Sequence, residues 1–105
     1  MQAISHSDLK TMNEAEHRDF VLINVLPQDS FNKEHIRTSV NVPVDEDNFT
    51  SRVEQIAGSK EREVVVYCAS FDCDASTRAA EKLQQEGFTQ VYDYEGGTKD
   101  WFAHH

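Results

Sequence analysis

Val64-Val65-Val66-Tyr67-Cys68 is an apolar run of strand length that ends on a cysteine. A short polar loop follows over residues 69–74, and a pattern of helical period begins after it. Runs of this length and composition are typical of buried strands. The pattern therefore predicts a strand, a loop and a helix in succession, with Cys68 at the carboxyl end of the strand.

The rest of the chain repeats this alternation of strand and helix. Further strands are expected near Ile4 and over 20–25, 40–43 and 90–94, and further helices after a Ser5 or Ser7 cap and over 28–35 (with Phe31 facing inward), 47–57, 74–86 and 98–103. Alternation of this kind predicts an α/β fold with a central, mainly parallel five-stranded sheet and helices on both faces, in three layers. In such sheets sites form beyond the carboxyl ends of the strands, which is where Cys68 lies.

Length and composition bound the function. A chain of 105 residues with 38% hydrophobic and 28% charged residues is expected to form one globular domain over 1–105. The net charge of −9 argues against a nucleic-acid partner and against an anionic membrane surface. No apolar run approaches the roughly 20 residues of a membrane span, and the polar N-terminus is no signal peptide, so a cytoplasmic location is expected.

Cys68 is the candidate nucleophile. At the predicted junction of strand, loop and helix, backbone N–H groups and the positive end of a helix dipole converge on the thiol. That environment favours the thiolate, which is the reactive form of cysteine. The alternative is a buried structural cysteine, which is common among free cysteines.

Cys73 is the second cysteine of the same loop. Two cysteines this close do not resemble the disulfide framework of a secreted mini-protein. Cys73 has three readings: a resolving thiol that attacks a persulfide on Cys68, a second sulfur carrier, or an inert loop residue. No metal is expected, because two thiols lack the further ligands of a structural zinc site. No other cofactor is expected.

Several segments, in order and spacing, give the chain a family resemblance. They are Leu22-Ile23-Asn24-Val25, Phe31 with His35-Ile36, Asn41-Val42-Pro43, Tyr67-Cys68, Ala79-Ala80 with Leu83, Gly87-Phe88, Val91, and Glu95-Gly96-Gly97 before Trp101. Together they resemble the rhodanese (sulfurtransferase) domain over nearly the whole chain. The resemblance implies a rhodanese-like fold and a sulfurtransferase that carries a sulfane sulfur as a persulfide on Cys68.

The implied reaction has two halves. A small sulfur donor (thiosulfate, a polysulfide or a persulfide) loads Cys68, and a thiophilic acceptor (cyanide, a thiol or a protein partner) unloads it. Two successive displacements of this kind predict ping-pong kinetics. The sulfur is expected to lie in a cradle of backbone N–H groups. The cradle and its helix start comprise Ala69, Ser70, Phe71, Asp72, Asp74, Ala75 and Ser76, and Ser76 either donates toward the sulfur or caps the helix.

The chain departs from the family pattern in two places. Asn24 and Leu26 stand where family members usually have an Asp and an Arg, so an ion pair expected there is missing. The loop after Cys68 is about two residues longer than the common form, lacks its frequent arginine, and carries Asp72 and Asp74. Two carboxylates beside the sulfur are expected to raise the pKa of the thiol and to repel thiosulfate. A neutral or protein-bound persulfide is therefore the expected donor.

Other conspicuous residues have simpler readings. The resemblance makes His35 a structural residue that orders the backbone between helix and strand. Arg78 is the basic residue expected nearest to the loop, either solvated or weakly orienting an anion. Gly96-Gly97 is expected to form a tight turn packed near the loop rather than a phosphate site. His104-His105 is either native or the stub of an expression tag, and carries no functional argument.

Three other functions compete with sulfur transfer. A phosphatase or arsenate reductase of related fold needs an arginine six residues after the cysteine to clamp an oxyanion, and Asp74 stands there instead. A thiol redox protein would cycle Cys68 and Cys73 between dithiol and disulfide. A catalytically silent binding module is the third alternative, and the retained cysteine at the strand end argues against it.

Overall fold

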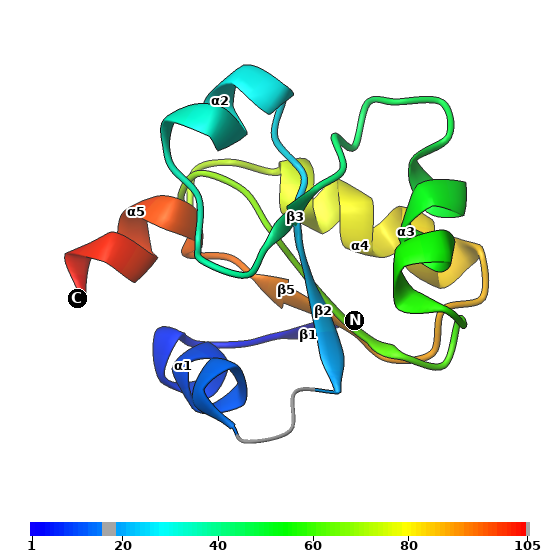
Figure 1. Cartoon of the computed structure of the whole chain (residues 1–105), viewed down its shortest axis with the longest axis horizontal. Coiled ribbons are helices and arrows are strands. Elements are labelled where there is room, and N and C mark those ends of the chain that lie inside the picture. The colour runs from blue at the N-terminus through cyan, green and yellow to red at the C-terminus, as the bar shows by residue number, and fades with distance from the viewer. Residues whose placement is uncertain (16–18, 105) are drawn as a thin grey trace.

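The computed structural model describes residues 1–15 and 19–104; His105 lies outside this range. Ten elements alternate along the described chain (Figure 1). The strands are β1 (Gln2–Ala3), β2 (Phe20–Asn24), β3 (Val40–Asn41), β4 (Glu63–Tyr67) and β5 (Val91–Tyr94). The helices are α1 (His6–Glu14), α2 (Gln28–Lys33), α3 (Phe49–Ala57), α4 (Ala75–Gln85) and α5 (Gly97–Ala103).

The five strands form one parallel sheet in the order β1-β5-β4-β2-β3. The stretch at residues 64–68 supplies its central strand, because β4 pairs with β2 on one side and with β5 on the other. Along β4, side chains alternate between two hydrophobic cores, as the pleat of a strand requires. Val64 and Val66 enter one core, and Val65 and Tyr67 enter the other. Cys68, two residues after Val66, enters the same core as Val64 and Val66.

Helices cover both faces of the sheet, which confirms the predicted three-layer arrangement. Phe49 and Val53 of α3 and Ala79 and Leu83 of α4 pack into the core that contains Cys68. The opposite core is closed by α1 and α5, through Leu9 and Trp101. Figure 1 shows α1 and α5 on one side of the sheet and α3 and α4 on the other.

The predictions for the cap of α1 and for the orientation of Phe31 in α2 have different outcomes. Ser5 is the cap of α1: its hydroxyl accepts from the N–H of Asp8, and the Asp8 carboxylate accepts from the N–H of Ser5. Phe31 was expected to face inward, and this is wrong, because α2 has no buried residue. The ring of Phe31 instead stacks on the ring of His35, with 4.0 Å between the ring centroids.

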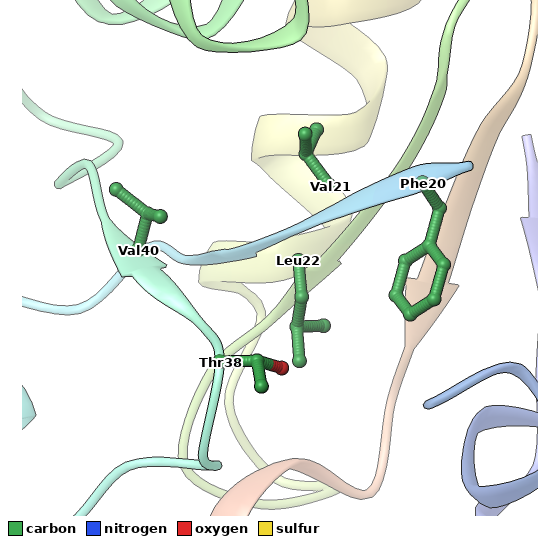
Figure 2. A pocket seen from close by; sticks show the side chains of 5 residues that line it. All are labelled: Phe20, Val21, Leu22, Thr38 and Val40. Atoms are coloured by element: carbon green, nitrogen blue, oxygen red, sulfur yellow. The ribbon is translucent and has the colours of Figure 1, made fainter. Parts of the chain in front are cut away.

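β3 is too short to cover the whole length of β2. It pairs only with Ile23 and Asn24, and a pocket of about 170 Å³ lies beside the uncovered half, lined by Phe20, Val21, Leu22, Thr38 and Val40 (Figure 2). The parallel register places Phe20 opposite Glu63, at the start of β4. The pocket therefore lies at the end of the sheet away from Cys68.

Within the described ranges, no helix has the length and apolarity needed to cross a membrane.

Candidate active site

Cys68 is the first residue after β4, and its side chain points into the core under α4. It has no exposed surface. Two hydrogen bonds fix the backbone at the end of β4. The N–H of Val25, just after β2, donates to the carbonyl of Tyr67, and the N–H of Thr98 in α5 donates to the carbonyl of Cys68 itself. The predicted position at the carboxyl end of a central strand is thus confirmed, and the thiol lies deeper than a solvent-facing nucleophile would.

The sulfur of Cys68 contacts two groups of the loop and helix. Its thiol donates to the backbone carbonyl oxygen of Cys73, 3.4 Å away, and lies 3.6 Å from the hydroxyl of Ser76. Ser76 is in the first turn of α4 and is buried, so its hydroxyl is held against the sulfur. The N-cap of α4 is Asp74, with no side-chain cap hydrogen bond. Of the two roles expected for Ser76, the geometry gives the one toward the sulfur.

The pKa of the Cys68 thiol is raised above its ordinary value. Burial is the largest cause, and a hydrogen bond that the Cys68 thiol donates to the side chain of Cys73 adds to it. The hydroxyl and the backbone N–H of Ser76 act in the opposite direction, since both stabilise a thiolate. The prediction that the helix start makes this site favour the thiolate is therefore wrong for this conformation. Asp72 and Asp74, expected to raise the pKa, are not among its causes.

The predicted cradle of N–H groups is also not formed as expected. The N–H of Asp72 donates to the hydroxyl of Ser70, and the N–H of Cys73 donates to the carbonyl of Ser70. The N–H of Asp72, one of the expected donors, and the N–H of Cys73 therefore bond within the loop, and a carbonyl oxygen faces the sulfur instead. The physical reason is the length of the loop, which leaves room for a turn closed on Ser70. Ser76 supplies the donors that do reach the sulfur.

The start of α5 holds the first residues of the loop. The N–H of Lys99 and the hydroxyl of Thr98 both donate to the carbonyl of Ala69, at 2.9 and 3.2 Å. Gly97 has a φ of +64°, and a Cβ added there would lie 2.3 Å from the carbonyl oxygen of Cys68. The expectation that Gly96-Gly97 packs near the loop is thus confirmed. The turn brings α5 close enough to bind the Cys68-Ala69 backbone.

Cys73 lies inside the loop beside Cys68. Both cysteines are free. Cys73 is half-buried and packs against the same core that contains Cys68. Cys73 is among the causes that raise the pKa of the Cys68 thiol, after burial. The structure therefore brings together the two thiols that the sequence singled out.

The outer side of the loop borders a pocket of about 240 Å³. Its walls come from the loop and from α5: Ser70, Phe71, Asp72, Gly96, Lys99, Asp100 and Ala103. Phe71 stands at the loop tip with 70% of its surface exposed. Lys99 was overlooked in the sequence. Its place two residues after the Gly-Gly turn was the available signal, because that turn packs α5 against the loop.

Arg78, by contrast, is engaged on the far side of the loop. Its guanidinium pairs with Asp45 at 3.3 Å and with Asp74 at 3.5 Å, and all three side chains are largely exposed. Asp74 is therefore partly neutralised by an ion pair rather than facing the sulfur alone. The Nδ1 of the exposed His35 donates to the carbonyl of Phe31 at 2.8 Å, at the end of α2, and its role in ordering the backbone between helix and strand stays a prediction.

Asn24 and Tyr67 complete the carboxyl edge of the sheet. Asn24 is buried, and its side-chain oxygen accepts from the N–H of Leu26 at 2.9 Å. An amide thus closes the turn where the family resemblance would place an ion pair. The hydroxyl of Tyr67 accepts from the N–H of Ile36 and bonds to Ser39, which ties the segment before β3 to β4.

Comparison with known proteins supplies the family. The chain is 32% identical over 104 residues to the thiosulfate sulfurtransferase GlpE of Coxiella burnetii (strain RSA 331 / Henzerling II), covering 97% of this chain and 88% of that protein. A solved rhodanese with anions from E. coli superposes with a TM-score of 0.66 at 30% identity, covering 77% of this chain and 89% of that one.

The Alr3790 protein from Anabaena sp. shares the fold, with a TM-score of 0.82 at 24% identity over 95% of this chain and 85% of that one. The family model described as the rhodanese-like domain matches residues 5–104. The parallel sheet, the cysteine after its central strand and these matches agree. The chain belongs to the rhodanese-like domain family.

Proposed function

We propose that residues 1–105 act as one rhodanese domain that transfers sulfane sulfur through a persulfide on Cys68. The observation that carries this proposal is the contact of the Cys68 sulfur with Ser76 at the first turn of α4. The Ser76 hydroxyl and N–H are the donors that a thiolate or a persulfide anion needs at this position. The name of the Coxiella relative supports the same class of reaction.

The first half-reaction loads the sulfur. The thiolate of Cys68 attacks the outer sulfur of a donor, a bond forms between Sγ and that sulfur, and the donor's S–S bond breaks. The donor leaves with the electron pair, as sulfite from thiosulfate or as a shorter polysulfide. In the second half-reaction a cyanide or thiolate acceptor attacks the outer sulfur, and Cys68 leaves as thiolate. Covalent catalysis of this kind proceeds by a ping-pong mechanism.

Access to Cys68 requires movement of the loop over residues 69–74. A thiol with no exposed surface cannot meet a donor from solvent in the described conformation. The loop is suited to open, because Phe71 and Asp72 at its tip are exposed and its internal turn is held by hydrogen bonds to Ser70. The turn at Ser70 then opens as well, and this frees the N–H groups of Asp72 and Cys73 to face the added sulfur.

The charges around the loop favour some donors over others. Asp72 lines the outer pocket and opposes a dianion such as thiosulfate, whereas Lys99 on the same pocket attracts it. Asp74 is paired with Arg78. With a net charge of −9 on the whole chain, a neutral or protein-bound persulfide remains the proposed physiological donor. The proposed acceptor is a thiol or a protein partner, and the proposed location is the cytoplasm.

The test is the intact mass of the reduced protein after brief exposure to polysulfide. One added sulfur on Cys68, located by peptide mapping and removed by cyanide, is the expected result. Cys68→Ser is expected to take up none. An unchanged mass in the native protein, under conditions that load a known rhodanese, would overturn the proposal and leave a binding module on this fold.

A further inference from the structure

Cys73 is a second free thiol, and it lies inside the closed loop that begins after Cys68. Its backbone carbonyl is 3.4 Å from the Cys68 sulfur, its side chain packs against the core that holds Cys68, and both cysteines are free thiols. Four residues separate the two cysteines, so a bond between them would close a short ring within one loop.

We propose that Cys73 is a resolving thiol that discharges the Cys68 persulfide as hydrosulfide. This inference rests on the proposed function, since it needs the persulfide as its substrate. It assigns the domain a second outcome for the sulfane sulfur: reduction inside the loop instead of transfer to an acceptor from solvent.

The step balances in atoms and electrons. The Cys73 thiolate attacks Sγ of Cys68, which is the inner sulfur of the persulfide, and a bond forms between the two Sγ atoms. The bond from Cys68 Sγ to the outer sulfur breaks, and the outer sulfur, which carries the proton of the neutral persulfide, leaves with the electron pair as hydrosulfide. The sulfane sulfur is reduced by two electrons, and the two cysteines are oxidised to a disulfide. A low-molecular-weight thiol then reduces the disulfide and restores both thiols.

Geometry favours attack on the inner sulfur. Cys68 Sγ is buried, so an acceptor from solvent reaches it poorly, whereas the half-buried Cys73 packs against the same core within the same loop. Holding a nucleophile next to its target replaces a bimolecular encounter by an intramolecular one. Transfer of the outer sulfur would require Cys68 to leave as a thiolate, and burial, which raises the pKa of Cys68, makes it a poor leaving group. Hydrosulfide is a weaker base and leaves more readily.

The experiment is a single-turnover discharge without any external thiol. The native protein and the Cys73→Ser and Cys73→Ala variants are loaded with polysulfide, freed of small molecules under anaerobic conditions, and followed by intact mass and by sulfide release. In the native protein, up to one equivalent of sulfide per loaded persulfide is expected, with the added sulfur lost and a Cys68–Cys73 disulfide formed. In both variants the added sulfur stays on Cys68, and sulfide release is at least about tenfold slower.

The outcomes separate the two proposals. Cyanide must still remove the added sulfur from the variants, which shows that their persulfide is intact and chemically competent. If the native protein keeps its added sulfur as long as the variants do, or releases sulfide without forming the disulfide, the resolving role is wrong and the persulfide carrier stands. If neither the native protein nor the variants gain sulfur, the proposed function fails and this inference fails with it.

Discussion

The thiol of Cys68 donates a hydrogen bond to the backbone carbonyl oxygen of Cys73, with 3.4 Å between the sulfur and the oxygen. A carbonyl oxygen accepts from a thiol and repels a thiolate, so this loop conformation is complementary to the protonated cysteine. Ionisation of Cys68, or addition of a sulfur to it, removes the donor and leaves two electron-rich groups in contact. The resting loop and the reactive loop therefore have to differ at this contact.

The reactivity of Cys68 is expected to rise with pH beyond the range of an ordinary cysteine. Burial raises the pKa of this thiol, so its alkylation rate should reach half of its maximum above about pH 8.5. Iodoacetamide labelling in the Cys73→Ser background, with mass detection, measures Cys68 alone. A midpoint near pH 7 or below would show that the thiol ionises in an environment unlike the one described.

The same shift predicts a pH dependence of stability. Because the pKa of Cys68 is higher in the folded state, the unfolded chain loses this proton first, and the free energy of unfolding falls as pH rises above about 8.5. Below about pH 8.5 the Cys68 thiol is protonated in both the folded and the unfolded chain, so it does not change the free energy of unfolding with pH. Denaturant unfolding at pH 7.5 and 9.5 should show a smaller decrease in Cys68→Ser than in the native protein. Equal decreases in the two proteins would contradict the shift.

Replacing Ser76 by alanine is expected to slow sulfur loading. The Ser76 hydroxyl stabilises the Cys68 thiolate, and a hydrogen bond to a charged group contributes about 1.5 kcal/mol or more. The second-order rate of loading by polysulfide at fixed pH should therefore fall about tenfold. Ser51→Ala, an exposed change on α3, is the matched control and should load at the native rate. Equal rates for the two variants would remove Ser76 from the site.

Gly97→Ala tests how α5 holds the loop. Gly58→Ala is its matched control, because both glycines have a positive φ but a Cβ at Gly58 meets no atom within 4 Å. The control should lose about 1 kcal/mol of unfolding free energy from backbone strain alone, and Gly97→Ala about 3 kcal/mol, because its Cβ also overlaps the Cys68 carbonyl. Chemical denaturation measures both. Equal losses would show that α5 and the loop separate without cost.

Asp72→Asn is expected to improve the use of thiosulfate. Removing one carboxylate from the pocket that Lys99 also lines should raise kcat/KM for this dianion roughly threefold, the size expected for an exposed charge interaction. With a neutral organic polysulfide as donor, kcat/KM should stay at the native value. Asp47→Asn, an exposed change before α3, controls for net charge. An equal gain in that variant would assign the effect to the whole chain.

The sequence predicted the sheet, the helix positions and the place of Cys68 because each depends on local patterns. The run from Val64 to Tyr67 is apolar at every position, and only a central strand buries both of its faces. Helical period gave α3 and α4 to within about two residues of their ends, and residue type offered Ser5 and Ser7 as caps of α1, of which the structure uses Ser5. The orientation of Phe31 could not be predicted in this way, because α2 is short and the Phe31 ring stacks on the ring of His35 rather than packing into a core.

The state of the site was decided by tertiary contacts. The helix start does place Ser76 against the sulfur, as the pattern indicated, but complete burial of Cys68 outweighs it, and burial depends on how the loop folds over the core. Lys99 escaped attention for the same reason, since it is about thirty residues from the loop in sequence and reaches it only through the α5 turn. Local periodicity therefore determined which elements form and where the cysteine lies. The packing of segments distant in sequence decided whether that cysteine is a thiol or a thiolate, because desolvation is set by everything that surrounds it.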